Sequence, residues 1–178
     1  MEKEVAPDVR VVPAEEFLAY SRFKLFGQYW PRLQQCVASL KPEHIWWRPN
    51  AASNSIGNLL LHLSGNVRQW LVASFNAERD ERNRPAEFSR TDALGGADPL
   101  ADLSSTMSAA EQVLSRLTES DLTKTYSIQG YTVSGLGAVY QVVEHFGLHY
   151  GQIAYITKML TANDLSFYKE LEKTGRAR

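Results

Sequence analysis

Residues 134–160 read SGLGAVYQVVEHFGLHYGQIAYITKML, and this stretch decides the fold class. Its apolar residues recur at the spacing of a helix, and Ser134 is suited to cap the first turn. His145 and His149 interrupt the apolar pattern four residues apart, which places both imidazoles on one face of the helix. Two neutral imidazoles at that separation can converge on one metal ion. The stretch therefore predicts a long, mostly apolar helix with a candidate pair of metal ligands.

A line of polar residues runs along this predicted helix, and a similar line runs along another. The first line consists of Gln141, His145, His149 and Gln152. The second lies on a helix predicted to start after Ser53 or Ser55 and to end near Glu78, and it consists of Asn58, His62, Asn66 and Gln69. A buried polar group without a partner costs roughly 1–3 kcal/mol. We therefore expect the two lines to face each other across a bundle, around one metal ion and its waters.

The residues alone leave two interpretations of the histidines open. Three protein ligands with an open fourth position are typical of a catalytic divalent site. A helical histidine beside leucines is also typical of a hydrogen-bonded, half-buried residue that binds no metal. The pair differs from the zincin motif, because Phe146 stands where that motif has glutamate.

Two further helices complete a predicted all-α four-helix bundle. One spans about Pro13 to Leu40 and contains Pro31, where we expect a kink or two consecutive helices. The other spans Asp98 to about Leu117 and begins with a favourable cap and first-turn proline.

The connections between these helices are unequal in length. Residues 79–97 are predicted to form a long crossover between the second and third helices. Residues 125–133 suit a small hairpin or an extended loop. We expect one domain over residues 11–165. The tails are residues 1–10 and 166–178, and a short terminal helix is expected to follow from Ser166.

The composition excludes several classes of partner and site. The 178 residues carry 19 basic and 20 acidic side chains, so we expect neither nucleic-acid binding nor a polybasic membrane surface. No apolar run is long enough to span a membrane, and no signal-peptide pattern follows Met1, so a cytoplasmic location is expected. The single cysteine, Cys36, excludes an internal disulfide and a cysteine-rich zinc site, and it is predicted to lie in the core. A homodimer is expected only because it is the commonest assembly.

The order of these motifs resembles a known family. Ser55–Leu63, which contains His62, is followed later in the chain by His145–Gln152, and this arrangement is similar to the DinB-like (YfiT-like) metalloenzymes. Trp46–Pro49 and Arg84–Phe88 resemble segments of the DUF1572-type branch. The resemblance covers roughly residues 13–160. Relatives often have a basic residue after the last histidine, where this chain has Tyr150.

The resemblance implies a bundle with up-down-down-up helix order and one divalent metal ion. The ion would be held by His62, His145 and His149. Imidazole ligands favour zinc or nickel, with iron or manganese as alternatives. His44 is expected to stand apart and to pack on neighbouring aromatic residues.

Other residues are candidates for roles around the metal. Glu144 and Tyr29 are candidates for catalysis, although a solvated carboxylate and an aromatic core residue explain the same positions equally simply. The candidates for lining the cavity and contacting the cofactor are Asn66, Gln141 and Gln152.

Two classes of function fit these observations. The first is a metal-dependent enzyme that acts on a small molecule, as a thiol S-transferase or a hydrolase. Characterised DinB-like relatives include thiol-dependent enzymes, so the resemblance implies a low-molecular-weight thiol as partner and slightly favours transfer. The alternative is a non-enzymatic protein that binds a metal or a small ligand. The sequence does not identify the substrate.

Overall fold

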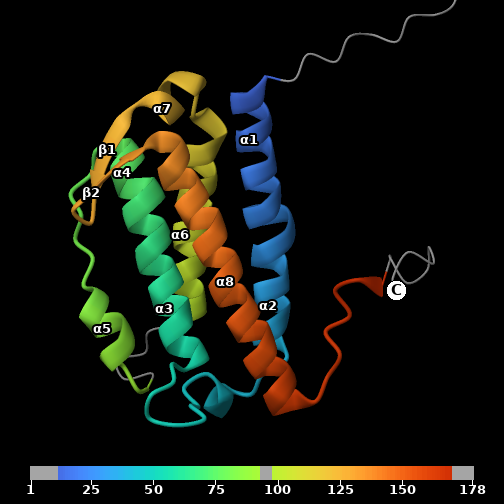
Figure 1. Cartoon of the computed structure of the whole chain (residues 1–178). Helices are drawn as coiled ribbons and strands as arrows, with labels where there is room; N and C mark the ends of the chain where they lie inside the picture. The colour runs from blue at the N-terminus through green and yellow to red at the C-terminus, as the bar shows by residue number, and fades with distance from the viewer. Residues whose placement is uncertain (1–11, 93–97, 170–178) are drawn as a thin grey trace, which may run out of the picture.

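The computed structural model describes residues 12–92 and 98–169 of the chain. Within these ranges most residues are helical, and one small hairpin supplies the strands. The predicted all-α class is therefore confirmed as a mostly helical fold with a minor two-stranded sheet. Figure 1 shows the long helices packed side by side, with the hairpin and α7 near one end and α5 beside the other half of α3.

The N-terminal helical segment contains the predicted irregularity at Pro31. It consists of α1 (Pro13–Arg22), a π-helical stretch η1 (Phe23–Tyr29) and α2 (Trp30–Ala38). Pro31 lies in the first turn of α2. The wider π-helical turns before it accommodate the ring, which in a regular helix clashes with the carbonyl of residue 27. The interruption is thus present as a change of helix type within a continuous segment.

The second segment begins at Ser55, not at Ser53. Its elements are α3 (Ile56–Val67), a π-helical stretch η3 (Arg68–Ala73) and α4 (Ser74–Asn76). The Ser55 hydroxyl accepts a hydrogen bond from the backbone N–H of Asn58, which satisfies one free donor of the first turn. Before it, the connection forms a short 3-10 helix, η2 (Pro42–His44). The segment ends at Ala77, whose φ of 54° stops a helix.

The crossover contains a helix that the sequence analysis did not predict. This helix, α5 (Arg84–Ser89), has Asn83 as its cap and Pro85 in its first turn. The Asn83 side chain accepts a hydrogen bond from the N–H of Ala86. A capping residue followed closely by proline is a helix-start signal. The signal was present, but the charged residues around it resembled a solvated loop.

The remaining elements follow the prediction closely. The third segment, α6 (Pro99–Arg116), is capped by Asp98, and a short helix, α7 (Glu119–Thr123), follows it. The strands β1 (Thr125–Ile128) and β2 (Tyr131–Ser134) pair antiparallel around Gln129 and Gly130. Both turn residues have positive φ, as a two-residue hairpin turn requires. Ser134 caps the last long helix, α8 (Gly135–Thr161).

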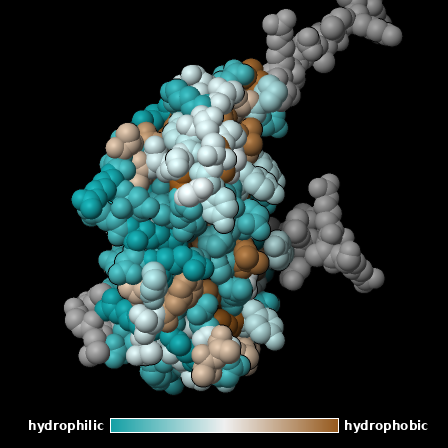
Figure 2. Space-filling model, turned by 60° about the vertical axis from the view of Figure 1, so that its left-hand side comes forward, coloured by the Kyte–Doolittle hydropathy of each residue, from teal (hydrophilic) through white to brown (hydrophobic). Residues whose placement is uncertain are grey.

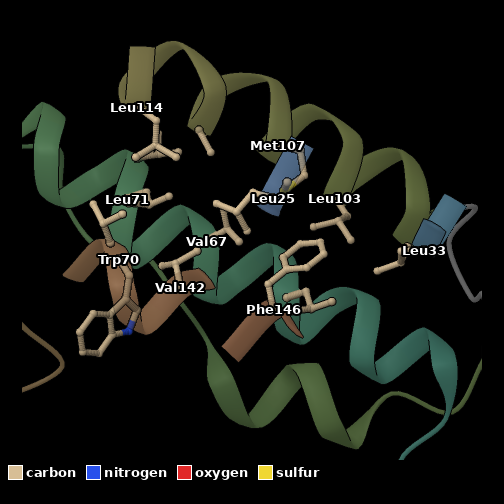
Figure 3. Packing of buried hydrophobic residues seen from close by; sticks show 14 of the residues in the cluster. Leu25, Leu33, Val67, Trp70, Leu71, Leu103, Met107, Leu114, Val142 and Phe146 are labelled. Carbon is tan, nitrogen blue, oxygen red and sulfur yellow. The ribbon is translucent and has the colours of Figure 1, made fainter. Parts of the chain in front are cut away.

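The core lies between α3, α6, α8 and the N-terminal segment. Figure 3 shows Phe146 of α8 among the side chains of Leu25, Leu103 and Met107. Phe146 is fully buried, so this face of α8 fixes the rotation of the helix about its axis. Cys36 is also fully buried, which confirms its predicted place in the core.

Two predictions concern the ends and the membrane. None of the helices in the described part of the chain is both long and apolar enough to cross a membrane. The predicted tail 1–10 lies outside the described residues, as does most of the predicted terminal helix after Ser166.

Candidate metal centre

Three of the four histidines meet at the contact between α3 and α8. His62 lies in the middle of α3, and His145 and His149 lie one turn apart on α8. One potential ligand nitrogen from each ring lies within 4.8 Å of the other two. The ring centroids are 4.4–4.9 Å apart and the rings meet edge to face. The structure thus brings together the three residues that the sequence singled out.

The shortest distance between two of these rings implies that a proton or a cation lies between their nitrogen atoms. His62 Nε2 lies 2.9 Å from His145 Nε2. Two imidazole lone pairs at this distance repel each other, so one nitrogen must carry a proton or a cation must lie between them. His62 is only 4% exposed, and His145 and His149 are half-buried, so water screens this interaction poorly.

A buried carboxylate fixes the tautomer of His62. Glu87 Oε2 lies 2.8 Å from His62 Nδ1, and Glu87 is 8% exposed. Arg82 Nη2, which only donates, lies 3.1 Å from the same nitrogen. The carboxylate is closer and only accepts, so we assign the Nδ1 proton to the hydrogen bond with Glu87. The Nε2 lone pair then faces the other two histidines. Metal-ligating histidines are typically oriented by a carboxylate in this way.

Gln152 plays the corresponding part for His149. Its Oε1 lies 2.8 Å from His149 Nδ1. With the amide oxygen as acceptor, His149 Nδ1 is the protonated nitrogen and Nε2 is free to accept. Gln152 therefore contacts one of the three histidines directly.

Burial favours the neutral forms of His145 and His149. Desolvation, together with the nearby His149 and His62, lowers the pKa of His145 to about 4. Burial also lowers the pKa of His149, against the opposing effect of its hydrogen bond to Gln152. Burial alone would raise the pKa of Glu87, but hydrogen bonds from His62 and Arg82 outweigh it and the pKa is lowered. The group therefore combines neutral imidazoles with an ionised carboxylate behind them.

The polar residues along α3 and η3 have hydrogen-bond partners other than those that the sequence predicted. The Asn58 side chain donates to the backbone oxygens of Glu87 and Arg90, and Gln69 bonds to Asp80 and Arg82. These partners all belong to the crossover, so Asn58 and Gln69 anchor that segment and do not face α8 across a shared metal cavity. Of the four residues in this line, only His62 belongs to the group of three histidines.

Asn66 has an unsatisfied polar atom. It lies one turn beyond His62 on α3 and is 4% exposed, and its Oδ1 is buried with no hydrogen-bond partner among the described residues. An acceptor in this position is suited to a donor that enters the site, such as a water or a ligand. Gln141 lies one turn before His145 on α8 and is half-buried.

The other candidates lie away from this contact. Tyr29 packs against Phe146 and Tyr150 on the side of α8 that faces the N-terminal segment. Glu144 is exposed, and it lines a surface pocket together with Tyr29. His44 accepts a hydrogen bond from the backbone N–H of Lys41 in the short helix η2. It lies outside the group of three, as expected.

Glu87 is the residue that sequence analysis missed. It belongs to a segment that was interpreted as a connection, and its partner His62 lies 25 positions earlier. A helix signal at Asn83 and Pro85 was available, but nothing local indicated that the helix packs against α3.

The donor set fits a divalent ion. It offers three neutral nitrogen ligands, two of them with tautomers set by Glu87 and Gln152, and the unpaired Asn66 oxygen lies one turn away. Three imidazoles suit first-row divalent metals from iron to zinc.

Comparison with known proteins gives a family and a fold. A protein-family model described as a protein of unknown function, DUF1572, matches residues 13–170. A DinB-like protein from Bacillus subtilis is similar in structure with a TM-score of 0.64 and 15% identity, over 86% of this chain and 97% of that one. For a DinB-like protein from Bacillus cereus the TM-score is 0.61 and the identity 16%, over 82% and 91%. No curated protein sequence gives a significant match.

Proposed function

The chain belongs to the DUF1572 family of the DinB-like superfamily, and from that premise we propose that it is a divalent-metal-dependent enzyme acting on a small molecule. The metal ligands in this proposal are His62, His145 and His149. The reaction is thiol transfer or hydrolysis, with transfer preferred because of the thiol-dependent relatives that the superfamily resemblance implies.

One observation carries the proposal. Three neutral imidazoles from two helices present nitrogen atoms within 4.8 Å of one another in a largely buried place. Hydrophobic packing alone does not require this arrangement, since buried imidazole rings are polar and need hydrogen-bond partners or a metal ion. A divalent ion held by three neutral ligands keeps its full charge, and when bound it would lower the pKa of a water or thiol that reaches it.

A cavity beside the histidines provides space for a small molecule. It has a volume of about 740 Å³ and is lined by residues of α8, of α3 and of the connection before α3. The lining residues include Leu59 of α3 and Leu148, Gln152, Tyr155 and Met159 of α8. Gln152 also contacts His149, so the cavity adjoins the histidine group. The residues that line it carry no formal charge, which favours a neutral portion of the substrate there.

The test begins with metal content. Protein purified without a histidine tag and without chelator should hold close to one divalent ion per chain, measured by elemental analysis. The His145→Ala/His149→Ala double variant should lose it. A content far below one ion that does not change in the double variant would refute the three-histidine site. The same measurement identifies the metal, for which zinc or nickel is proposed ahead of iron or manganese.

A substrate screen then separates the reaction types. Bacillithiol, mycothiol, coenzyme A and glutathione are each offered with electrophiles, and esters are offered without a thiol. Thiol-dependent turnover that requires His145 supports transfer, whereas ester cleavage without thiol supports hydrolysis. Failure of every substrate, combined with tight binding of a small molecule by calorimetry, would instead support a non-enzymatic binding protein.

Three structural expectations remain part of the proposal. The helix order is up-down-down-up, which agrees with the directions in which α1, α3, α6 and α8 run in Figure 1. The protein acts in the cytoplasm. It forms a homodimer, which light scattering at several protein concentrations tests directly.

A further inference from the structure

We propose that Glu87 is a positioning residue for His62, and that Arg82 holds its carboxylate in place. The carboxylate lies in a notch, which is the space that the missing side chain of Gly65 leaves on α3. The crossover between α4 and α6 then forms part of the metal centre. The inference rests on the proposed function, because it concerns how one of the proposed ligands is prepared for the metal.

The contacts of Glu87 are those of a fixed group. Its Oε2 accepts from His62 Nδ1 at 2.8 Å, and its Oε1 accepts from Arg82 Nε at 2.7 Å. Arg82 Nη2 also donates to Oε2, at 2.9 Å, so the guanidinium binds both carboxylate oxygens. A two-point contact of this kind fixes the plane of the carboxylate as well as its position.

Further contacts hold this pair against α3. Arg82 Nη1 donates to Gln69 Oε1 at 2.9 Å. Asn58 donates to the backbone oxygen of Glu87, also at 2.9 Å. His62 lies between Asn58 of α3 and Gln69 of η3 in the same helical segment, so the crossover is anchored on both sides of the histidine. Figure 2, turned towards the side on which α5 lies in Figure 1, shows a mostly hydrophilic surface with hydrophobic residues in small separate areas.

Gly65 makes the room that this arrangement needs. A Cβ atom at this position would overlap Glu87 Oε1 and would lie 2.8 Å from Arg82 Nε. Alanine at position 65 would therefore push the ion pair away from the helix. Glycine in a helix interior is less stable than alanine, and the close approach of the ion pair accounts for its presence here.

The charges explain why this arrangement suits a metal ligand. Glu87 accepts the hydrogen bond from His62 Nδ1–H, so the lone pair of the ring is on Nε2. The carboxylate also makes Nε2 a stronger electron-pair donor to a cation. Arg82 cancels the charge of Glu87, so the carboxylate can be buried without an unpaired charge beside the ligand. The tautomer and the ring orientation of His62 would thus be fixed before a metal ion binds. Metal binding would then carry no free-energy cost for fixing either of them.

The experiment compares zinc affinity across matched variants of the full chain, by competition with a chromophoric chelator. Glu87→Gln removes the charge, and Gly65→Ala keeps Glu87 but fills the notch. Both should bind zinc about 10–100-fold more weakly than the native protein. Glu81→Gln makes the same charge change at an exposed site on the same crossover, and Gly137→Ala makes the same glycine change where the nearest atom lies 3.4 Å away. Both controls should stay within about twofold of native affinity.

A second measurement separates positioning from general loss of structure. Long-range ¹H–¹⁵N spectra of the metal-free protein report which His62 nitrogen is protonated. The native protein and both controls should show the Nδ1–H tautomer, and Glu87→Gln and Gly65→Ala should show a mixture. Circular dichroism records helix content in each sample.

The outcomes distinguish the two proposals. Native protein that binds zinc while Glu87→Gln and Gly65→Ala bind it equally well would overturn the positioning role alone, as would a native His62 protonated at Nε2. Native protein that binds no zinc would overturn the metal site together with this inference. Weaker binding in both variants with an altered His62 tautomer supports the inference.

Discussion

His62 Nε2 and His145 Nε2 lie 2.9 Å apart although the two residues are separated by 83 positions in the chain. The contact joins the middle of α3 to the middle of α8, and both rings are shielded from water. Without metal, one of the two nitrogens carries the proton of an N–H···N hydrogen bond. A bound cation would replace that proton and link the two helices. Metal binding should therefore be measurable as stability of the whole fold.

The first prediction follows from that link. Zinc at about 100 times its dissociation constant should stabilise the native protein by about 2.7 kcal/mol, because only the folded chain holds the three nitrogens together. Thermal denaturation with and without zinc measures the effect. His145→Ala should abolish the increment, whereas Glu144→Gln, one position away and exposed, should retain it. An equal increment in native protein and His145→Ala would contradict binding at this site.

The second prediction concerns acid stability of the metal-free protein. The pKa of His145 is lowered by burial from 6.5 to about 4 in the folded state. Between these values the unfolded chain binds more protons than the folded one, so the free energy of unfolding rises with pH. The contribution of His145 to the free energy of unfolding is fully present above about pH 6.5 and is lost as the pH falls towards 4. The loss should be on the order of 1–2 kcal/mol, since the ring is partly exposed.

Urea denaturation of metal-free protein at pH 7.0, 6.0 and 5.0 tests this. His145→Asn should make the dependence over this range less steep, because it removes one of the two buried rings whose pKa is lowered. A dependence as steep in His145→Asn as in the native protein would assign the acid sensitivity to other groups. Zinc-loaded protein should lose its metal over a lower pH range than unburied histidine ligands would, since protons compete less well for buried rings.

The features that the sequence predicted are those with local causes. The spacing of His145 and His149 follows from helix geometry alone, so the prediction that they share a face needed no tertiary information. The cap at Ser134 and the turn at Gln129 and Gly130 are also local, because a few adjacent residues determine each conformation.

The features that it missed depend on distant contacts. Asn58 and Gln69 share a helix face with His62, and periodicity assigned all three to one environment. The crossover instead binds Asn58 and Gln69 and presents Glu87 to His62. The sequence does not predict the notch at Gly65, since a glycine within a helix can have causes other than the close approach of another segment. Which residues a long connection contacts depends on its path across the surface, and composition does not encode that path.

The third prediction concerns Cys36. The thiol is fully buried, and burial raises its pKa to about 11. Only the thiolate reacts readily, so at pH 8 the native protein should react with a disulfide reagent at least about 100-fold more slowly than the urea-unfolded chain. The unfolded chain should release one equivalent, because the sequence has one cysteine. Similar rates in both states would show that the thiol is accessible.

The last prediction concerns the contact between Trp46 and Gly57 at the start of α3. The Gly57 N–H donates to the backbone oxygen of Ile45 at 2.7 Å, and a Cβ at position 57 would lie 2.7 Å from the Trp46 ring. Gly57→Ala should therefore destabilise the protein by about 1–3 kcal/mol, although alanine is the better helix former. Urea denaturation followed by circular dichroism measures the change.

A double-mutant cycle identifies the cause of that loss. In a Trp46→Ala background the three atoms nearest to the added methyl group are absent, so Gly57→Ala should cost much less or should stabilise the helix. Gly137→Ala, at a helical position with ordinary contacts, should be neutral or stabilising in both backgrounds. The same penalty for Gly57→Ala with and without Trp46 would show that the tryptophan ring is not the obstacle. A penalty that disappears with the ring would establish that Trp46 packs directly on the first turn of α3 and leaves room there only for glycine.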